Sequence, residues 1–306
     1  MDLLRPDTWP DRPLVMGIVN VTPDSFSDGG QHHRWDKAVE HALQLVRDGA
    51  DVLDVGGEST RPGSDPVDVA EELDRVLPVI RVLAGETDTP ISIDTRKPAV
   101  AEAALEAGAV LVNDVNGLRE PGMIETIAGA GVGACIMHMQ GTPRTMQQEP
   151  HYDDVVGEVL DFLRDQAHRA IAAGVDRERI WIDPGIGFGK TLEHNLALLA
   201  ALDRFAELGY PVLVGASRKR FIDRIRTAPV DERLGGSLAA IADITRLPRA
   251  VLRVHDVFAT RQFLEVRARI AEARAGHLAP ALRSESPFDE AASGDDDPNG
   301  REDRRG

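Results

Sequence analysis

The stretch Leu14-Val-Met-Gly-Ile-Val-Asn-Val-Thr-Pro-Asp-Ser-Phe-Ser-Asp-Gly-Gly30 decides how the rest of the chain is interpreted. Its first half, Leu14 to Val21, is a short apolar run with β-branched residues, as expected for a strand that is buried on both faces. Its second half is polar and turn-forming, with Pro23-Asp24-Ser25 followed by Asp28-Gly29-Gly30. A helical pattern resumes near Trp35. A strand, a loop with polar groups and a helix together form one unit of an α/β protein.

This unit recurs along the chain. Strands are expected at Leu14 to Val21, Val52 to Val55, Pro90 to Thr95, Val110 to Val115, Gly133 to Met139, Ile180 to Asp183, Pro211 to Gly215 and Ala250 to Val254. Amphipathic patterns between and after them predict helices, among them Lys37 to Asp48, Val67 to Leu83, Tyr152 to Ala173 and Val257 to Ala275. Strands and helices in this alternation predict a (β/α)8 TIM barrel. A doubly wound sheet is the alternative, but no Gly-x-Gly-x-x-Gly motif follows the first strand.

The composition is that of an acidic globular chain. Its 306 residues include 35 Lys and Arg against 51 Asp and Glu, and the net charge of −16 argues against a nucleic-acid surface. Any bound anion must therefore be held by a local cluster of cations. The sequence has no apolar run of about 18 residues, so no membrane span is expected. The single cysteine, Cys135, fits a reducing cytoplasm and is interpreted as a small buried residue of a strand.

The composition changes near the end of the chain. Residues 1–280 are expected to form the single barrel domain. From Ala281 to Gly306 the chain is acidic, rich in Ser, Gly and Pro and nearly without apolar residues, which predicts a disordered tail. A regulatory or partner-binding role for this tail is the alternative.

Polar side chains follow nearly every predicted strand. In a barrel the C-terminal ends of the strands lie on one face, where active sites are built from several strands at once. The residues at these ends are Asn20, Glu58, Asp94, Asn113, His138, Asp183, Ser217 with Lys219, and Arg253 with His255. Helix capping or turn formation can explain any one of them. A barrel with only a structural role would not need so many, so we expect a ligand site at this face.

Three of these residues, Asp94, Asn113 and Asp183, have no basic neighbour in their own motifs. Such a set suits the N–H and carbonyl groups of a flat heterocycle, because carboxylates accept paired N–H donors and an amide both donates and accepts. The alternative is that Asp94 and Asp183 cap the helices that follow them.

A second set of residues is cationic or donates hydrogen bonds. Its members are Asn20, Arg61, Lys219, Arg253 and His255. Phosphate sites of barrels commonly follow the seventh and eighth strands, beside helix N-termini, so this set predicts a phosphate or diphosphate site. The alternative for Arg218-Lys219-Arg220 is a solvated charged run.

The segment Gly185-Ile-Gly-Phe-Gly-Lys-Thr191 looks like a P-loop but is one residue too short between its first glycine and Gly-Lys. We interpret its glycines as a tight turn from strand to helix that lets a planar ligand approach the backbone. His32, His33 and His138 do not have metal-ligand spacing, and no Cys/His cluster predicts zinc.

Seven motifs in this order resemble the dihydropteroate synthase family, over about Leu14 to Ala275. They are Asn-Val-Thr-Pro-Asp-Ser-Phe-Ser-Asp-Gly-Gly (Asn20 to Gly30), Gly-Gly-Glu-Ser-Thr-Arg-Pro-Gly (Gly56 to Gly63), Ile-Asp-Thr (Ile93 to Thr95), Asn-Asp-Val (Asn113 to Val115), Asp-Pro-Gly-Ile-Gly-Phe-Gly-Lys (Asp183 to Lys190), Ser-Arg-Lys (Ser217 to Lys219) and Arg-Val-His-Asp (Arg253 to Asp256). The resemblance implies a folate-pathway transferase that joins 6-hydroxymethyl-7,8-dihydropterin diphosphate to p-aminobenzoate, with release of pyrophosphate.

The resemblance also implies residue roles at the matching positions. Those implied to bind the pterin are Asp94, Asn113, Met137, Asp183, Gly215 and Lys219. Those implied to bind the diphosphate are Asn20, Arg61, Arg253 and His255, with Asn20 also a ligand of Mg²⁺. Those implied to form the p-aminobenzoate pocket, where sulfonamides compete, are Phe26, Thr60, Arg61, Pro62 and Lys219. Those implied to be catalytic are Asp28, Asp94 and Lys219. The family further suggests a homodimer.

The chemistry favours a dissociative displacement. Loss of pyrophosphate first would leave a cation at the pterin methylene, which Asp28 or Asp94 could stabilise while a closed loop excludes water. A pterin-dependent methyltransferase is one alternative, but it would not need the Ser-Thr-Arg-Pro loop or the anion site at Arg253 and His255. A non-catalytic pterin-binding paralogue is the other. Arg220, where many relatives carry Ser, affects the expected edge of the p-aminobenzoate pocket.

Overall fold

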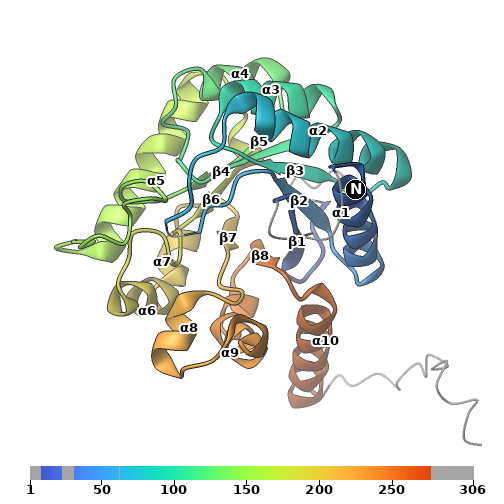
Figure 1. Ribbon diagram of the computed structural model, residues 1–306. Helices are drawn as coiled ribbons and strands as arrows, with labels where there is room; N and C mark the ends of the chain where they lie inside the picture. Colours follow the sequence, from blue (N-terminus) through green and yellow to red (C-terminus); the bar gives the residue numbers. More distant parts are fainter. Residues whose placement is uncertain (1–7, 23–30, 62, 277–306) are drawn as a thin grey trace, which may run out of the picture. The chain divides into compact units, whose positions relative to one another are not determined.

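Eight parallel strands close into a barrel in chain order, with helices around the outside (Figure 1). This computed structural model describes residues 8–22, 31–61 and 63–276. The strands are β1 (Leu14–Asn20), β2 (Val52–Gly56), β3 (Ile91–Asp94), β4 (Leu111–Asp114), β5 (Gly133–Met137), β6 (Ile180–Asp183), β7 (Val212–Val214) and β8 (Ala250–Val254). The predicted TIM barrel is therefore confirmed, and the doubly wound alternative is wrong.

The helices alternate with the strands as the sequence predicts. They are α1 (Gln31–Arg47), α2 (Val69–Glu86), α3 (Pro98–Glu106), α4 (Met123–Ala130), α5 (Val155–Ala172), α6 (Leu192–Ala200), α7 (Leu202–Ala206), α8 (Arg220–Ile225), α9 (Leu234–Ala240) and α10 (Val257–Arg274). Short 3₁₀ helices lie at Arg177–Arg179, Val230–Glu232 and Ile244–Arg246. Contacts place the chain through Glu265 in one compact unit, and the end of α10 from Val266 belongs to a second. The predicted tail, residues 281–306, lies outside the described residues.

The ends of several helices follow from local capping chemistry. The side chain of Asp68 accepts a hydrogen bond from the backbone of Glu71 and begins α2, and Asp154 caps α5 in the same way. Thr191 and His194 form a reciprocal capping box at the start of α6. After α1 the chain turns at Gly49, whose φ of +97° is a conformation that glycine adopts without strain.

Alternation along the strands separates most of their apolar side chains into an outward cluster and an inward cluster, apart from a smaller third cluster around Met137. Outward side chains such as Val15, Val19 and Ile182 pack against the helices in the larger cluster. Inward side chains form a second cluster inside the barrel, made of Leu14, Met16, Val52, Leu111, Cys135, Trp181, Leu213 and Val251. Trp9 packs edge to face on Trp181 with 5.6 Å between ring centroids. The half of the barrel nearest the N-terminal ends of the strands is therefore filled with apolar side chains, among them the buried Cys135 that the sequence predicts.

The strand registers place polar residues above this apolar filling. Asp54 on β2 pairs with Ser92 on β3, which pairs with Leu111 on β4, and Asn113 lies two residues further along. The one-residue stagger per strand of an eight-stranded barrel brings inward residues of alternate strands to one level. Asp54, Asn113, Asp183 and Arg253 thus form a polar layer from β2, β4, β6 and β8. Asp94, Met137 and Gly215 come from the odd strands and lie one level nearer the C-terminal mouth.

No helix in the described part of the chain is both long and apolar enough to cross a membrane.

Candidate active site

The polar layer and the loops above it bring most of the predicted site residues together at the C-terminal mouth of the barrel. Asp94, Asn113, Met137 and Asp183 are all at least nine-tenths buried there. Gly215 lies beside two predicted ligand residues, since a Cβ added to it would be 3.6 Å from Lys219 Nζ and 3.9 Å from Arg253 Cβ. Asn20 is half-buried at the end of β1, where its register partner is Gly56. Phe26, Asp28 and Pro62 lie outside the described residues.

Arg253 is the centre of a buried charge network. Its Nε donates to Asp54 Oδ2 at 2.6 Å, and its Nη2 donates to Asp94 Oδ2 at 2.7 Å. Asn113 Nδ2 donates to the same oxygen of Asp54 at 3.1 Å. The sequence separated a heterocycle-binding set from an anion-binding set, and the structure joins the two sets through the contact of Arg253 with Asp94.

Burial sets the protonation of this network. It raises the pKa of Asp94 to about 7, although the charge of Arg253 opposes the shift. Burial also disfavours the charged form of Arg253, but Asp54 and Asp94 outweigh it and raise the pKa of the guanidinium. Arg253 is therefore a permanent cation at the mouth, whereas Asp94 can gain or lose a proton near neutral pH.

The helix-capping alternative is wrong for both aspartates. Asp94 contacts Arg253, and the residue that caps α3 is Lys97, through its backbone position. Asp183 Oδ1 accepts from the backbone N–H of Gly185 at 2.7 Å, within the turn, while Thr191 caps α6. Burial raises the pKa of Asp183, and Lys219 opposes that shift.

Lys219 lies directly after β7 and reaches across to the loop that follows β6. Its ammonium donates to the backbone carbonyl of Ile186 and lies 4.5 Å from the centroid of the Phe188 ring. Burial lowers the pKa of Lys219 to about 8, although Asp183 opposes the shift. The solvated-run alternative is thus wrong for Lys219 and describes only the exposed Arg220.

Ser217 contacts both the backbone and the ring of His255. Its Oγ accepts from the backbone N–H of His255 at 3.2 Å and lies 3.0 Å from the ring Nδ1. The hydroxyl can donate to Nδ1 of a neutral ring or accept from it, so this contact holds the ring in place in either tautomer. Burial and the charges of Arg253 and Arg218 lower the pKa of His255 to about 4, so the ring is neutral at pH 7. Arg218 is paired with Asp256 through two hydrogen bonds of 2.9 and 2.5 Å.

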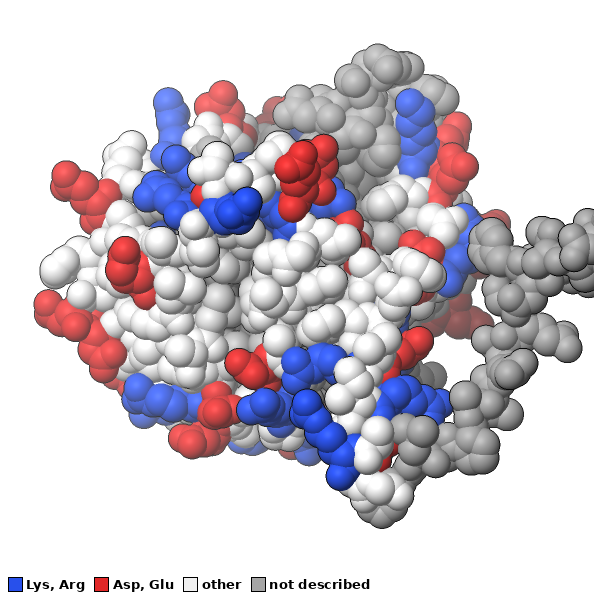
Figure 2. Space-filling view, turned by 90° about the horizontal axis from the view of Figure 1, so that it is seen from below, with Lys and Arg blue, Asp and Glu red and all other residues white. Residues whose placement is uncertain are grey.

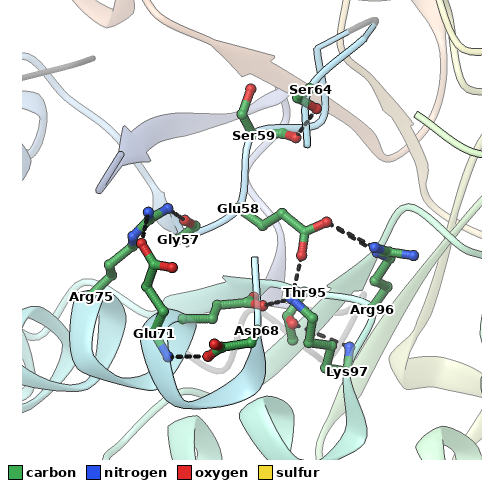
Figure 3. A network of polar contacts seen from close by, with 11 residues as sticks. Gly57, Glu58, Ser59, Ser64, Asp68, Glu71, Arg75, Thr95, Arg96 and Lys97 are labelled. Carbon is green, nitrogen blue, oxygen red and sulfur yellow. Dashed lines mark hydrogen bonds and ion pairs between the residues drawn. The ribbon is translucent and has the colours of Figure 1, made fainter. Parts of the chain in front are cut away.

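The loop after β2 is held by residues of the loop after β3 and of α2 (Figure 3). Glu58 accepts from Arg96 at 2.9 Å and from Lys97, which also pairs with the buried Glu72 of α2. The loop also folds on itself, because Ser64 Oγ donates to the backbone carbonyls of Ser59 and Arg61. Thr60 is half-buried and Arg61 exposed beyond this anchor. Glu58, expected at the ligand site, is thus an anchor of the loop.

The glycine-rich turn after β6 has a different cause from the one the sequence suggested. Gly185 has a φ of +69°, and a Cβ there would lie 1.9 Å from the carbonyl oxygen of His138. The close packing of two loops, rather than the approach of a ligand, therefore requires this glycine. Lys190 joins the same loops by donating to the carbonyl of Phe188 at 2.9 Å and to His138 Nδ1 at 3.0 Å. Burial, with the Lys190 charge, lowers the pKa of His138 to about 2.

Asp54 is the site residue that sequence reasoning missed. It is fully buried, and it contacts both Arg253 and Asn113. The available signal was a lone aspartate in the run Val52-Leu-Asp-Val-Gly56, two positions before the strand end and therefore on the inward face.

Metal-binding groups are sparse in the described part of the site. Outside the gaps at 1–7, 23–30, 62 and 277–306, no group of three or more His, Cys, Asp or Glu side chains could hold a metal ion. The amide oxygen of Asn20 is a hard donor at the mouth. Mg²⁺ usually keeps several waters and binds substrate phosphates, so an oxygen donor at Asn20 is compatible with this ion.

Known proteins share this sequence and architecture. The family model for pterin binding enzymes matches residues 16–255. The chain is 47% identical to dihydropteroate synthase of Escherichia coli strain K12 over 254 residues, which cover 83% of this chain and 90% of the relative. The solved structure of Xanthomonas albilineans dihydropteroate synthase with 4-aminobenzoic acid superposes with a TM-score of 0.79 at 50% identity, covering 88% of this chain and 95% of that one. Burkholderia cenocepacia dihydropteroate synthase complexed with 7,8-dihydropteroate gives 0.77 at 44% identity, covering 87% and 94%.

The barrel, its polar mouth and the matched family define the class as the pterin-binding enzymes. Within this class, the sequence identity of 44–50% to dihydropteroate synthases over most of the chain decides the family. The chain belongs to the dihydropteroate synthase family, whose members are transferases.

Proposed function

We propose that the protein joins 6-hydroxymethyl-7,8-dihydropterin diphosphate to p-aminobenzoate, forming 7,8-dihydropteroate and pyrophosphate. The observation that carries this proposal is the buried layer of acceptors and one cation, Asp54, Asn113, Asp183 and Arg253, at the mouth of a barrel of this family. Acceptors of this kind suit the N–H groups of a pterin, and a permanent cation beside them suits its diphosphate. A barrel with only a structural role would not need to bury charged side chains at this level.

The pterin would enter edge first. Asp183 has one carboxylate oxygen committed to Gly185, which leaves the other for ring N–H donors. Lys219 would donate to the pterin carbonyl, and Met137 would pack on the ring. Asp94, with a pKa of about 7, can face either a donor or an acceptor.

The diphosphate would bind to donors from the ends of β1 and β8 and from the loop after β2, namely Asn20, Arg61, Arg253 and His255. Arg253 uses its Nε and Nη2 groups for Asp54 and Asp94, and its other N–H groups remain for an anion. The neutral ring of His255 would donate from Nε2 in the tautomer whose Nδ1 accepts from Ser217. Mg²⁺ held at Asn20 would neutralise charge on the leaving group.

The harder chemical step is departure of pyrophosphate, because an aryl amine is already neutral at pH 7. Well-placed donors contribute roughly 2.7–4 kcal/mol each to such a step. Departure would break the bond between the methylene carbon and oxygen, leaving a cation delocalised into the ring. The amine nitrogen of p-aminobenzoate would then attack that carbon and lose a proton. Asp94 or Asp28 would stabilise the cation.

The p-aminobenzoate pocket would be formed by Phe26, Thr60, Arg61, Pro62 and Lys219, and we expect sulfonamides to compete there. The exposed Arg220 begins α8 and would lie at the edge of this pocket. A cytoplasmic location accords with the single, unpaired cysteine.

A homodimer is also proposed. Apolar side chains on three helices are exposed, with Leu196 of α6 at 42%, Ile225 of α8 at 61% and Phe258 of α10 at 63%. Figure 2 shows a broad uncharged area bordered by charged side chains on the side of the molecule where these helices lie. Uncharged areas of this kind favour association.

The test is pyrophosphate release from the pterin diphosphate with Mg²⁺, with and without p-aminobenzoate, in wild type and in Lys219→Ala. We expect release coupled to dihydropteroate formation in wild type and its loss in the variant. Pterin binding by calorimetry without turnover would support the non-catalytic paralogue instead. If pyrophosphate never forms without p-aminobenzoate, even in the bound complex, the dissociative order is wrong.

A further inference from the structure

We propose that Asp54 is a positioning residue that decides which end of the Asn113 amide, its carbonyl oxygen or its NH₂ group, is offered to the heterocycle. This inference rests on the proposed pterin site. Asp54 is fully buried below the mouth, so it acts through the two residues that it contacts.

The geometry gives Asp54 control of Asn113. Its Oδ2 receives two donors, Arg253 Nε at 2.6 Å and Asn113 Nδ2 at 3.1 Å. A carboxylate only accepts, so the amide must turn its NH₂ group toward Asp54 and its carbonyl oxygen away. Asn113 therefore offers that carbonyl oxygen and one remaining N–H to other partners.

Arg253 makes this orientation depend on the charge of Asp54. A guanidinium attracts a carbonyl oxygen, so without the carboxylate the nearby Arg253 would favour the flipped amide. With Asp54 in place, Asn113 and Asp183 both offer acceptors in the same layer. The site then selects a ligand edge that carries neighbouring N–H donors.

Stability does not account for Asp54. Its Oδ1 is buried and has no hydrogen-bond partner among the described residues, which is costly for a carboxylate. Nor is Asp54 the sole counter-charge of Arg253, because Asp94 pairs with the same guanidinium at 2.7 Å. Asp54 is thus costly for stability and is not the only ion-pair partner of Arg253. Its role in orienting Asn113 explains its presence.

The test is a double-mutant cycle of Asp54→Asn with Asn113→Ala. Binding of 6-hydroxymethylpterin, which lacks the diphosphate, is measured by calorimetry so that anion contacts do not contribute. We expect Asp54→Asn to weaken binding about tenfold in wild type, because the charge that holds the Asn113 NH₂ group toward position 54 is lost and hydrogen bonds to charged groups contribute about this much. In the Asn113→Ala background the same change should alter binding by less than about twofold.

The control is Ser92→Ala. Ser92 is the register partner of Asp54 on β3, is equally buried, and its hydroxyl has no hydrogen-bond partner in the part of the chain that the structure describes. This variant should bind the pterin as wild type does. Circular dichroism establishes that each variant folds, and Asp54→Ser replaces Asp54→Asn in the cycle if the latter does not.

The outcomes separate the two proposals. Equal weakening by Asp54→Asn in both backgrounds, with a wild type that binds pterin and forms dihydropteroate, would overturn the role of Asp54 alone. A wild type that binds no pterin would overturn the proposed function and this inference together. Weakening that disappears in the Asn113→Ala background would support both.

Discussion

The two ends of the barrel bury the same kinds of charged group with opposite consequences. At the N-terminal end, Asp51 accepts from Arg12, from Arg261 and from the backbone of Val15. These partners outweigh burial and lower the pKa of Asp51. At the C-terminal end, burial prevails over the partners and raises the pKa of Asp94 to about 7. The partners therefore compensate the charge of the carboxylate at the N-terminal end, whereas they do not compensate that of Asp94 at the mouth.

The difference implies a division of labour that mutation can test. Residues of the N-terminal half should affect stability without affecting chemistry, and residues of the mouth should do the reverse. A barrel in which both ends contributed equally to both properties would contradict this division.

The largest expected effect is at the apolar end. Trp181 is 1% exposed and contacts Trp9, so Trp181→Ala would leave a large cavity. We expect a loss of about 3–5 kcal/mol in the free energy of unfolding, measured by urea denaturation. The KM values of the remaining folded enzyme for both substrates should match wild type. Altered KM values would show that the mouth depends on packing below it.

The next effect is at the mouth. Lys219→Ala should lower kcat/KM by about 10²–10³, the typical loss for a well-placed donor at an active site. The free energy of unfolding should not fall, because burial already lowers the pKa of this ammonium to about 8 and its charge is costly to the fold. Arg261→Met at the opposite end is the control, and it should reduce stability with kcat/KM retained.

The sequence predicts the features that depend on local patterns, but not the contacts between residues that are far apart in the chain. The barrel, the alternation of its side chains and the polar strand ends depend on local patterns, so the sequence predicts them. The partners of Arg253 depend on barrel closure, which brings Asp54 beside it from 199 positions away in the chain. Likewise, only the packing of two loops reveals that Gly185 is required by His138. What the sequence could not supply is therefore the choice of partner between distant strands.

Activity and stability should also differ in their pH dependence because of Lys219. Its folded pKa of about 8 lies below the ordinary value of 10.5, so between these values the unfolded chain binds more protons than the folded one. This group therefore makes the fold more stable as pH rises from about 8 to 10.5. Activity should instead fall about tenfold per pH unit above 8, since the ammonium is lost. Rate profiles and urea denaturation over this range check both directions, and Lys219→Met should remove both dependences.

The smallest expected effect concerns the loop after β2, which ion pairs hold in place at the mouth of the barrel. Glu58→Gln would remove the charge that Arg96 and Lys97 hold, while the pair of Lys97 with Glu72 remains. We expect KM for p-aminobenzoate to rise about threefold, since partly exposed ion pairs contribute about 1 kcal/mol or less. Affinity for 6-hydroxymethylpterin, which lacks the diphosphate, should not change, because the residues predicted to contact the pterin ring lie on other strands. The matched control is Glu71→Gln in the same network, whose carboxylate is 54% exposed and pairs with Arg75 (Figure 3). Equal effects of Glu58→Gln on p-aminobenzoate and on 6-hydroxymethylpterin would mean that the anchor supports the whole mouth rather than this one loop.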